Sequence, residues 1–256
     1  MNAVLLEARN IGKRFGGVQA LKNVSLTIRH GEIYGLIGPN GAGKTTLFNV
    51  FTGLYPRDSG TVLFAGAPLN MESPHKVSAA GIARTFQNIR LFGNMSTREN
   101  VMVGRHVRTR AGVFGAILRT RAERAEEVAI RRRADELLHY VGIAERADDL
   151  ARHLSYGDQR RLEIARALAT EPKLLALDEP AAGMNATETA ALRSLIEGLR
   201  QDGLTVLLIE HDVKLVMGLC DRVAVLDYGE KIAEDVPEAV RADPQVIEAY
   251  LGAGGG

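Results

Sequence analysis

An eight-residue segment in the first fifth of the chain has the spacing of a phosphate-binding loop. It follows the pattern G-x-x-x-x-G-K-[ST], and its residues are Gly38, Pro39, Asn40, Gly41, Ala42, Gly43, Lys44 and Thr45. Glycines let successive N–H groups point inward at a phosphate, and a helix N-terminus adds its positive dipole end. The Lys44 ammonium can reach the β- and γ-phosphates, and the Thr45 hydroxyl can ligate Mg²⁺. The segment, extended by Thr46, predicts a nucleoside triphosphate site.

Two adjacent carboxylates end an apolar run in the second half of the chain. Asp178 and Glu179 directly follow the run 174–177 and precede a proline. Ligands of open α/β sheets bind outside the carboxyl ends of the strands. Asp178 is placed to hold the Mg²⁺ shell, and Glu179 is placed to orient and polarise the attacking water. Two such acids can also be solvated turn residues, but the phosphate loop upstream favours the catalytic interpretation.

The elements that must position these residues alternate between strands and helices. Residues 4–9 and 24–29 alternate apolar and polar side chains, as half-buried strands do. The continuous apolar runs 174–177 and 205–209 suit parallel strands buried on both faces. Further strands are expected at 32–37, 61–64 and 222–226, and helical spacing of apolar residues predicts a helix over 44–54. Strands that alternate with helices predict an α/β sheet.

Composition excludes several classes of protein. The chain has 256 residues, of which 46% are hydrophobic, so it has enough apolar material to fold. Its 32 basic and 31 acidic residues give a net charge of +1, which makes no case for nucleic-acid binding. The single cysteine, Cys220, excludes an internal disulfide framework and a four-thiolate zinc site. No apolar run reaches the roughly 20 residues that span a bilayer, and the first residues do not resemble a signal peptide.

The middle of the chain, from about residue 97 to 153, is helical and charged with no strand candidates, which predicts an inserted helical subdomain. Within it, the stretch 105–133 holds nine arginines against three glutamates. Such a run is either a solvated helical face, a contact with a membrane protein loop or lipid headgroups, or a nucleic-acid contact. The glycine-rich end, 252–256, is expected to be disordered.

The segment 154–161, Leu-Ser-Tyr-Gly-Asp-Gln-Arg-Arg, resembles the signature motif of ABC-type ATPases. With the phosphate loop and the acidic pair in this order, the chain resembles an ABC transporter nucleotide-binding subunit over about residues 4–235. The resemblance implies an α/β P-loop NTPase fold with a parallel core sheet, an N-terminal antiparallel β subdomain and the inserted helical subdomain. It implies one ATPase domain over 1–256, with a tail from about 236, and it implies ATP and Mg²⁺ as ligands.

Other positions match the family one at a time. Phe15 stands where the family stacks an aromatic ring on adenine, and Gln87 matches the glutamine that contacts Mg²⁺ and the attacking water. His211 matches the histidine that contacts the γ-phosphate, and the loop 182–185 matches the one that touches the opposite protomer. Taken alone, Phe15 could be a core aromatic residue, Gln87 is uninformative, and Glu210-His211-Asp212 could be a metal site.

The signature segment also has a plain structural interpretation. Ser155 and Asp158 form an [ST]-x-x-[DE] capping pattern before a helix that runs to about residue 169. A capped helix N-terminus is also an anion site, and in the family Ser155 and Gly157 face the γ-phosphate held by the other protomer. Tyr156 replaces the usual glycine and Asp158 the usual glutamine. A triphosphate would repel that carboxylate unless the helix cap, Arg160 or Arg161 neutralises it.

The resemblance further implies partners. The phosphate loop and the signature each occur once, so two chains are expected to pair head to tail around two ATP molecules, with a second ATPase subunit of the same or a related kind. Without membrane spans, the chain is expected to drive separate permease subunits from the cytoplasmic face of the inner membrane, as a peripheral protein. No nucleic acid is expected.

Several stretches look most like the branched-chain amino acid uptake group, whose permeases receive solute from a binding protein. They are 86–92, 154–157, 163–168, 180–185 and 244–252. The alternatives are an ABC ATPase for another solute, or a soluble switch ATPase that acts on ribosomes or DNA. A P-loop GTPase or kinase is disfavoured because the guanine motif Asn-Lys-x-Asp is absent.

Overall fold

The computed structural model describes residues 3–71, 73–105 and 121–252. The amino-terminal part forms an antiparallel sheet in the order β2-β1-β4-β5. Its strands are β1 (Val4–Phe15), β2 (Val18–Arg29), β4 (Ser59–Phe64) and β5 (Ala67–Pro68). The first two are longer than the predicted 4–9 and 24–29, because a tight turn at Gly16 and Gly17 lets the hairpin pair up to Phe15 and Val18.

The central sheet has six strands in the order β10-β9-β3-β8-β7-β6. Five of them run parallel, and β10 (Glu230–Asp235) pairs antiparallel with β9. The parallel strands are β3 (Ile33–Ile37), β6 (Ile82–Arg84), β7 (Leu174–Asp178), β8 (Thr205–Ile209) and β9 (Arg222–Asp227). The short strand β6 was not predicted, because three residues show no periodicity. The predicted α/β class with a parallel core and antiparallel strands is confirmed.

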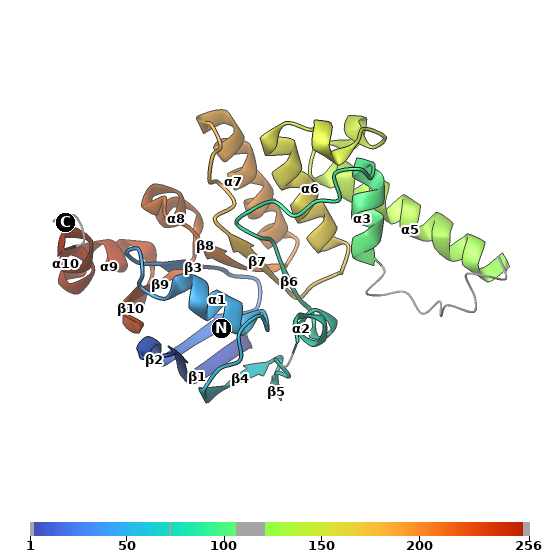
Figure 1. Ribbon diagram of the computed structural model, residues 1–256. Helices are drawn as coiled ribbons and strands as arrows, with labels where there is room; N and C mark the ends of the chain where they lie inside the picture. The colour runs from blue at the N-terminus through green and yellow to red at the C-terminus, as the bar shows by residue number, and fades with distance from the viewer. Residues whose placement is uncertain (1–2, 72, 106–120, 253–256) are drawn as a thin grey trace.

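The continuous apolar runs are explained by two cores, one on each face of the central sheet. In β7, Leu175 and Leu177 join one core, while Leu174 and Ala176 join the other. Side chains alternate between the faces of a strand, so a strand covered on both sides must be apolar throughout. The first core contains α7 (Ala186–Gln201) and α8 (Val213–Leu219), and the second contains α1 (Lys44–Phe51) and the antiparallel sheet (Figure 1).

The helix α1 ends at Phe51, three residues before the predicted end. Its last carbonyls are capped by the backbone of Thr52, and Leu54 lies 42% exposed beyond it. Between β5 and β6 lies α2 (Pro74–Ala80), a short helix capped by Ser73.

The segment from residue 97 to 153 is helical in its described parts. It contains α3 (Thr97–Arg105), α5 (Arg121–Tyr140) and two 3-10 turns, η2 (Ala144–Arg146) and η3 (Ala151–His153). It is followed by α6 (Tyr156–Leu168), which packs against α3 and β6. In Figure 1, α5 extends away from the sheet. Much of the arginine-rich stretch, from 106 to 120, lies outside the described residues.

The carboxyl-terminal residues form two helices, α9 (Pro237–Ala242) and α10 (Pro244–Gly252). Val240 and Val246 bury their side chains against the first core, which attaches these helices to the body of the protein. Residues 253–256, most of the glycine-rich end, lie outside the described residues. None of the described helices combines the length and the apolarity needed to cross a bilayer.

Candidate active site

The phosphate loop connects β3 to α1, as its sequence predicts. Gly38 and Gly43 have φ angles of 148° and 102°, which side-chain-bearing residues rarely adopt. A Cβ on Gly38 would lie 2.1 Å from the carbonyl oxygen of Leu226, so only glycine fits at this position. The N-cap residue of α1 is Gly43, so no side chain caps the first N–H groups of this helix. This arrangement favours an anion at the start of α1.

Lys44 is folded back over this loop. Its Nζ donates to the carbonyl oxygens of Gly38, at 2.7 Å, and of Pro39, at 2.9 Å. Burial lowers the pKa of Lys44, and the nearby Glu179 carboxylate partly opposes that shift. Lys44 is only 5% exposed, and these two hydrogen bonds hold its ammonium in place over the loop.

A cavity of about 510 Å³ opens over the loop and gathers residues from distant parts of the chain. Its walls include Gln87, Glu179 and His211, the three catalytic candidates, together with Val18, Gln19 and Ala20 from β2. The phosphate-loop residues in its walls are Asn40, Gly41, Ala42, Gly43, Lys44, Thr45 and Thr46. Tyr228, which is 80% exposed in the β9–β10 turn, also lines it, and sequence reasoning did not single this residue out.

Asp178 and Glu179 lie at the carboxyl end of β7. Asp178 is 3% exposed, and burial raises its pKa, while the Arg84 guanidinium, 3.7 Å away, acts in the opposite direction. Glu179 has a φ of 47°, and its N–H donates to the carbonyl oxygen of Ile209 on β8 at 2.9 Å. This turn separates the two carboxylates, so that Glu179 faces the cavity.

Both carboxylate oxygens of Glu179 have a partner. Gln87 donates from Nε2 to Oε2 at 2.8 Å, and Nε2 of His211 lies 2.5 Å from Oε1. Gln87 follows β6, Glu179 follows β7 and His211 follows β8, and these three strands are neighbours in the sheet. Parallel neighbours end at the same edge, so the strand order brings the three residues together.

The cluster of Glu210, His211 and Asp212 divides into three separate contacts. Glu210 is buried and accepts from the N–H of Ala181 at 2.8 Å, and burial raises its pKa. Asp212 accepts from the N–H groups of Lys214 and Leu215 and caps α8. In the described part of the chain, no group of three or more His, Cys, Asp or Glu residues is arranged to hold a metal ion.

Arg84 is a site residue that sequence reasoning missed. Its guanidinium lies between the rings of Phe48 and Phe86, at 4.6 and 4.4 Å from their centroids. It donates to Asn49 and Thr52 at the end of α1, and burial lowers its pKa to about 10. Its position at the end of β6, three residues before Gln87, was the available signal.

The signature residues lie at the start of α6. Ser155 caps the helix by accepting from the N–H of Asp158, at 3.2 Å. The carboxylate of Asp158 lies 3.6 Å from Arg161, and Arg160 turns inward instead, so Arg161 is the neutralising partner. Gly157 is buried, and a Cβ there would lie 2.8 Å from the Glu188 carboxylate. Among the described residues, those that line the phosphate-loop cavity include none from α6.

Phe15 lies on the surface rather than in the core. It is 43% exposed at the end of β1, with Tyr55 packed edge to face at 5.2 Å. The Lys13 ammonium lies 5.2 Å from the ring centroid. Phe15 does not line the cavity itself, but the next residues along the hairpin, Val18 to Ala20, do.

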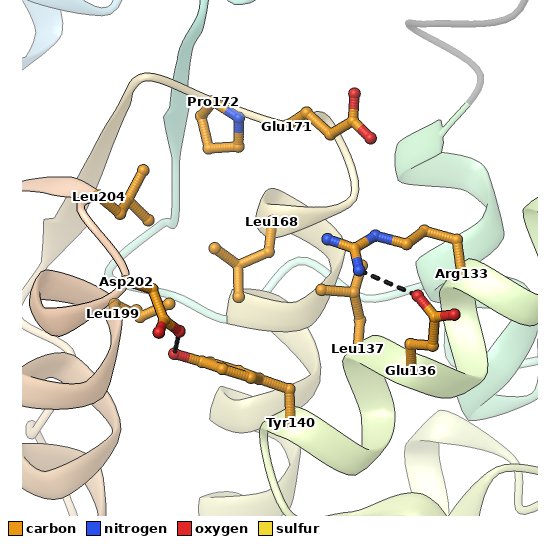
Figure 2. Close-up of a pocket in the computed structure, with 10 residues that line it drawn as sticks. All are labelled: Arg133, Glu136, Leu137, Tyr140, Leu168, Glu171, Pro172, Leu199, Asp202 and Leu204. Atoms are coloured by element: carbon orange, nitrogen blue, oxygen red, sulfur yellow. Dashed lines mark hydrogen bonds and ion pairs between the residues drawn. The ribbon is translucent and has the colours of Figure 1, made fainter.

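A second cavity, of about 460 Å³, lies between α5 and the end of α7 (Figure 2). Leu137, Leu168 and Leu199 form its apolar floor, and the Tyr140 hydroxyl donates to Asp202 across one end at 2.6 Å. Among its described lining residues there is none of the sequence-predicted site residues. Gln87, Glu179 and His211 line the phosphate-loop cavity and not this one, so the candidate chemistry lies over the phosphate loop.

Comparison with known proteins places this chain and its fold in one family. Residues 21–182 match the family described as ABC transporter, and residues 230–255 match the one described as branched-chain amino acid ATP-binding cassette transporter. The chain belongs to the ATP-binding cassette family of ABC transporters, which confirms the resemblance, and it is an ABC-type ATPase.

Individual relatives support this assignment. The chain is 46% identical to the high-affinity branched-chain amino acid transport ATP-binding protein LivG of Salmonella typhimurium, over 98% of this chain and 99% of LivG. The ADP conformation of MJ1267, an ATP-binding cassette of an ABC transporter, superposes with a TM-score of 0.85 at 32% identity, over 98% and 100% of the two chains. A dimeric cassette, MJ0796 bound to ADP and Pi, gives a TM-score of 0.76 at 27% identity, over 91% and 99%.

Proposed function

We propose that the chain hydrolyses ATP in the cavity over the phosphate loop, with Glu179 as the catalytic base. The observation that carries this assignment is the pairing of both Glu179 oxygens with Gln87 and His211 at the wall of that cavity. Two partners fix the carboxylate, and each of its oxygens keeps acceptor capacity for a water molecule. A base held in place in this way can align water with the γ-phosphate and take its proton.

The phosphates of ATP accept hydrogen bonds from the backbone N–H groups of residues 40–46 and from the Lys44 ammonium. Lys44 already points along the loop, where it donates to two carbonyl oxygens. Phosphate oxygens carry negative charge and replace these carbonyls as stronger acceptors. Phe15 offers its exposed ring to adenine at the end of the hairpin that leads into the cavity wall. His211 lies at the same wall and donates to the γ-phosphate.

The residues near the loop also fit Mg²⁺. Asp178 supplies a buried carboxylate, Thr45 an exposed hydroxyl and Gln87 an exposed amide oxygen, all of them hard oxygen ligands. A bound Mg²⁺ would neutralise charge on the β- and γ-phosphates. Arg84 contacts Asp178 from the side of α1, so it holds the carboxylate at the sheet edge.

The complete site is assembled from two chains. Ser155 and Gly157 begin α6, and their helix N-terminus is an anion site that does not line the cavity of its own chain. We infer that these residues bind the γ-phosphate held by a second ATPase subunit, of the same or a related kind, in a head-to-tail pair. The dimeric ADP- and Pi-bound relative supports pairing as a property of such cassettes.

The transported solute is a branched-chain or related hydrophobic amino acid. This assignment rests on the 46% identity to LivG and on the match of residues 230–255 to the branched-chain group. The subunit then lies at the cytoplasmic face of the inner membrane, bound to permease subunits. A solute-binding protein delivers the amino acid to these permeases.

Uptake and partner capture test this proposal together. Cells in which Glu179→Gln replaces the native residue should lose high-affinity uptake of radiolabelled leucine and keep uptake of an unrelated solute such as glucose. The tagged wild-type protein, extracted from native membranes with mild detergent, should carry integral permeases that mass spectrometry identifies. Unchanged leucine uptake would reject the substrate, and capture of ribosomal proteins without permeases would reject transport.

A further inference from the structure

A buried ion pair near the start of α6 plays no part in the mechanism above. Arg160 and Glu163 are 2% and 1% exposed, and Nη1 of Arg160 donates to Oε2 of Glu163 at 3.1 Å. Charged side chains of this kind are almost never fully buried unless paired. Neither residue lines the phosphate-loop cavity.

Most of the polar contacts of this pair go to the backbone of two residues on another segment. Nη1 of Arg160 donates to the carbonyl oxygen of Phe86 at 2.6 Å, and Nη2 donates to the carbonyl oxygen of Gln87. Glu163 Oε1 accepts from the N–H of Phe86 at 3.2 Å. Two side chains of α6 therefore hold three backbone polar groups of residues 86 and 87, which are the N–H and C=O of Phe86 and the C=O of Gln87. A planar guanidinium that engages two carbonyls fixes direction as well as distance.

The two segments joined in this way belong to different parts of the reaction. Gln87 reaches from this backbone to Glu179 at the cavity wall. One turn before Arg160, α6 begins with Ser155 and Tyr156. The Tyr156 hydroxyl lies 3.2 Å from Nη2 of Arg160, so the guanidinium touches the signature segment too.

Tyr156 extends the connection to a third segment. A Cβ placed on Gly183 would lie 3.3 Å from Cε1 of Tyr156, so the ring rests on the loop that follows Glu179. Tyr156 stands where the family has glycine, which has no side chain to make this contact. Arg160 thus lies between the backbone of Gln87, the start of α6 and the side chain that covers Gly183.

We propose that Arg160, oriented by Glu163, is a positioning residue. It couples movement of the Gln87 backbone to movement of the N-terminal end of α6, which carries the signature residues Ser155 and Gly157. The proposal rests on the proposed function, because it concerns how ATP bound at one site of the dimer affects ATP binding at the other site. When Gln87 shifts to contact its own nucleotide, the guanidinium transfers that shift to Ser155 and Gly157, which bind the nucleotide of the opposite subunit. A buried, charge-assisted link of three hydrogen bonds is rigid and poorly screened by salt.

Three variants separate this role from a purely structural one. Arg160→Lys keeps the positive charge and loses the planar guanidinium that donates to two carbonyls. Glu163→Gln keeps an acceptor for the N–H of Phe86 and loses the negative charge that orients Arg160. Arg193→Lys is the matched control, since Arg193 on α7 also pairs with a glutamate and donates to a backbone carbonyl, that of Gly218, away from the cavity. Each variant is made alone and with Glu179→Gln.

Three measurements are made on the full chain. The first is binding of a fluorescent ATP analogue to protein diluted until light scattering shows monomer, and the second is kcat with Mg²⁺-ATP. The third is the dissociation constant of the ATP-bound dimer by analytical ultracentrifugation in the Glu179→Gln background. Circular dichroism and the melting temperature show that each variant is folded at the assay temperature.

We expect the monomer affinity for ATP to stay within about twofold for both variants, because the pair does not touch the cavity. Dimer affinity and kcat should each fall about five- to a hundredfold, the range of coupling between linked sites, and Arg193→Lys should leave both unchanged. If Arg160→Lys does not fold, Glu163→Gln decides the question alone.

Two results would overturn the inference. One is a folded variant whose dimer affinity and kcat stay within twofold of the parent. The other is a loss of monomer ATP affinity as large as the loss of kcat, which would place the residue in the nucleotide site or the general fold. A parent that forms no dimer with ATP would instead overturn the proposed function.

Discussion

At the scale of single residues, Glu179 is where the chemistry depends most on one side chain. Its φ of 47° turns it away from Asp178, and two partners hold its carboxylate. We expect Glu179→Gln to bind ATP, to lose about two to four orders of magnitude in hydrolysis rate, and to accumulate as an ATP-bound dimer. Single-turnover hydrolysis and size-exclusion chromatography with ATP measure both effects. Full turnover in this variant would remove Glu179 as the base.

Lys44 contributes to binding itself. Its ammonium is buried against the loop and points along it, and a hydrogen bond to a charged group is worth about 1.5–3 kcal/mol. Lys44→Ala should therefore weaken ATP binding by roughly tenfold to a hundredfold. Isothermal titration calorimetry of the monomer measures this loss. An unchanged dissociation constant would contradict the phosphate role of Lys44.

At the scale of elements, the first turn of α6 contains the carboxylate of Asp158, which would repel a phosphate bound at this helix N-terminus. The cap of this helix uses the N–H of Asp158, so a glutamine at 158 keeps it. Arg161 lies 3.6 Å away and only partly offsets the carboxylate. Asp158→Gln should leave ATP hydrolysis unchanged or raise it by up to about fivefold, since like charges a few ångströms apart in water repel by about 1 kcal/mol. Steady-state ATPase rates decide this, and a large loss in a folded variant would show that the aspartate is required.

The packing of α3 on α6 depends on a close approach of their backbones. A Cβ on Gly104 would lie 2.3 Å from the carbonyl oxygen of Arg166, so α3 must move to admit it. We expect Gly104→Ala to lower the free energy of unfolding by about 1–3 kcal/mol. Gly198→Ala is the control, because that helical glycine has only the Tyr140 hydroxyl, 3.5 Å away, near its Cβ direction. It should be neutral or up to about 1 kcal/mol more stable in urea denaturation. Equal effects of the two substitutions would disprove the packing argument.

At the scale of the whole molecule, the separation of α6 from the phosphate-loop cavity makes one chain incomplete. ATP hydrolysis per chain should therefore rise in proportion to protein concentration in dilute solution and level off as dimers form. A dilution series with parallel light scattering measures the rate and the oligomeric state together. A strictly monomeric sample that hydrolyses ATP at the full rate would contradict the two-chain site.

Much of the fold and of the nucleotide site could be predicted from the sequence alone, because both depend on residues that are close together in the chain. The glycines and lysine of the phosphate loop act within eight residues, and the apolar runs of β7 and β8 report burial on both faces directly. The parallel core was recognisable for the same reason, whereas the antiparallel sheet was expected only from the resemblance to the family. The predicted ends of α1 and of β1 were wrong, because the hydrophobic pattern does not show the backbone cap at Thr52 or the hairpin turn at Gly16.

Only the tertiary structure decided which distant residues meet. Gln87 and Glu179 are 92 positions apart, and they touch because β6 and β7 are neighbours in a strand order that no local pattern encodes. The same holds for Arg84 beside Asp178 and for Arg160 on the backbone of Gln87. Periodicity reveals which face of an element is buried, whereas the order of strands in a sheet is set by the packing of all elements at once.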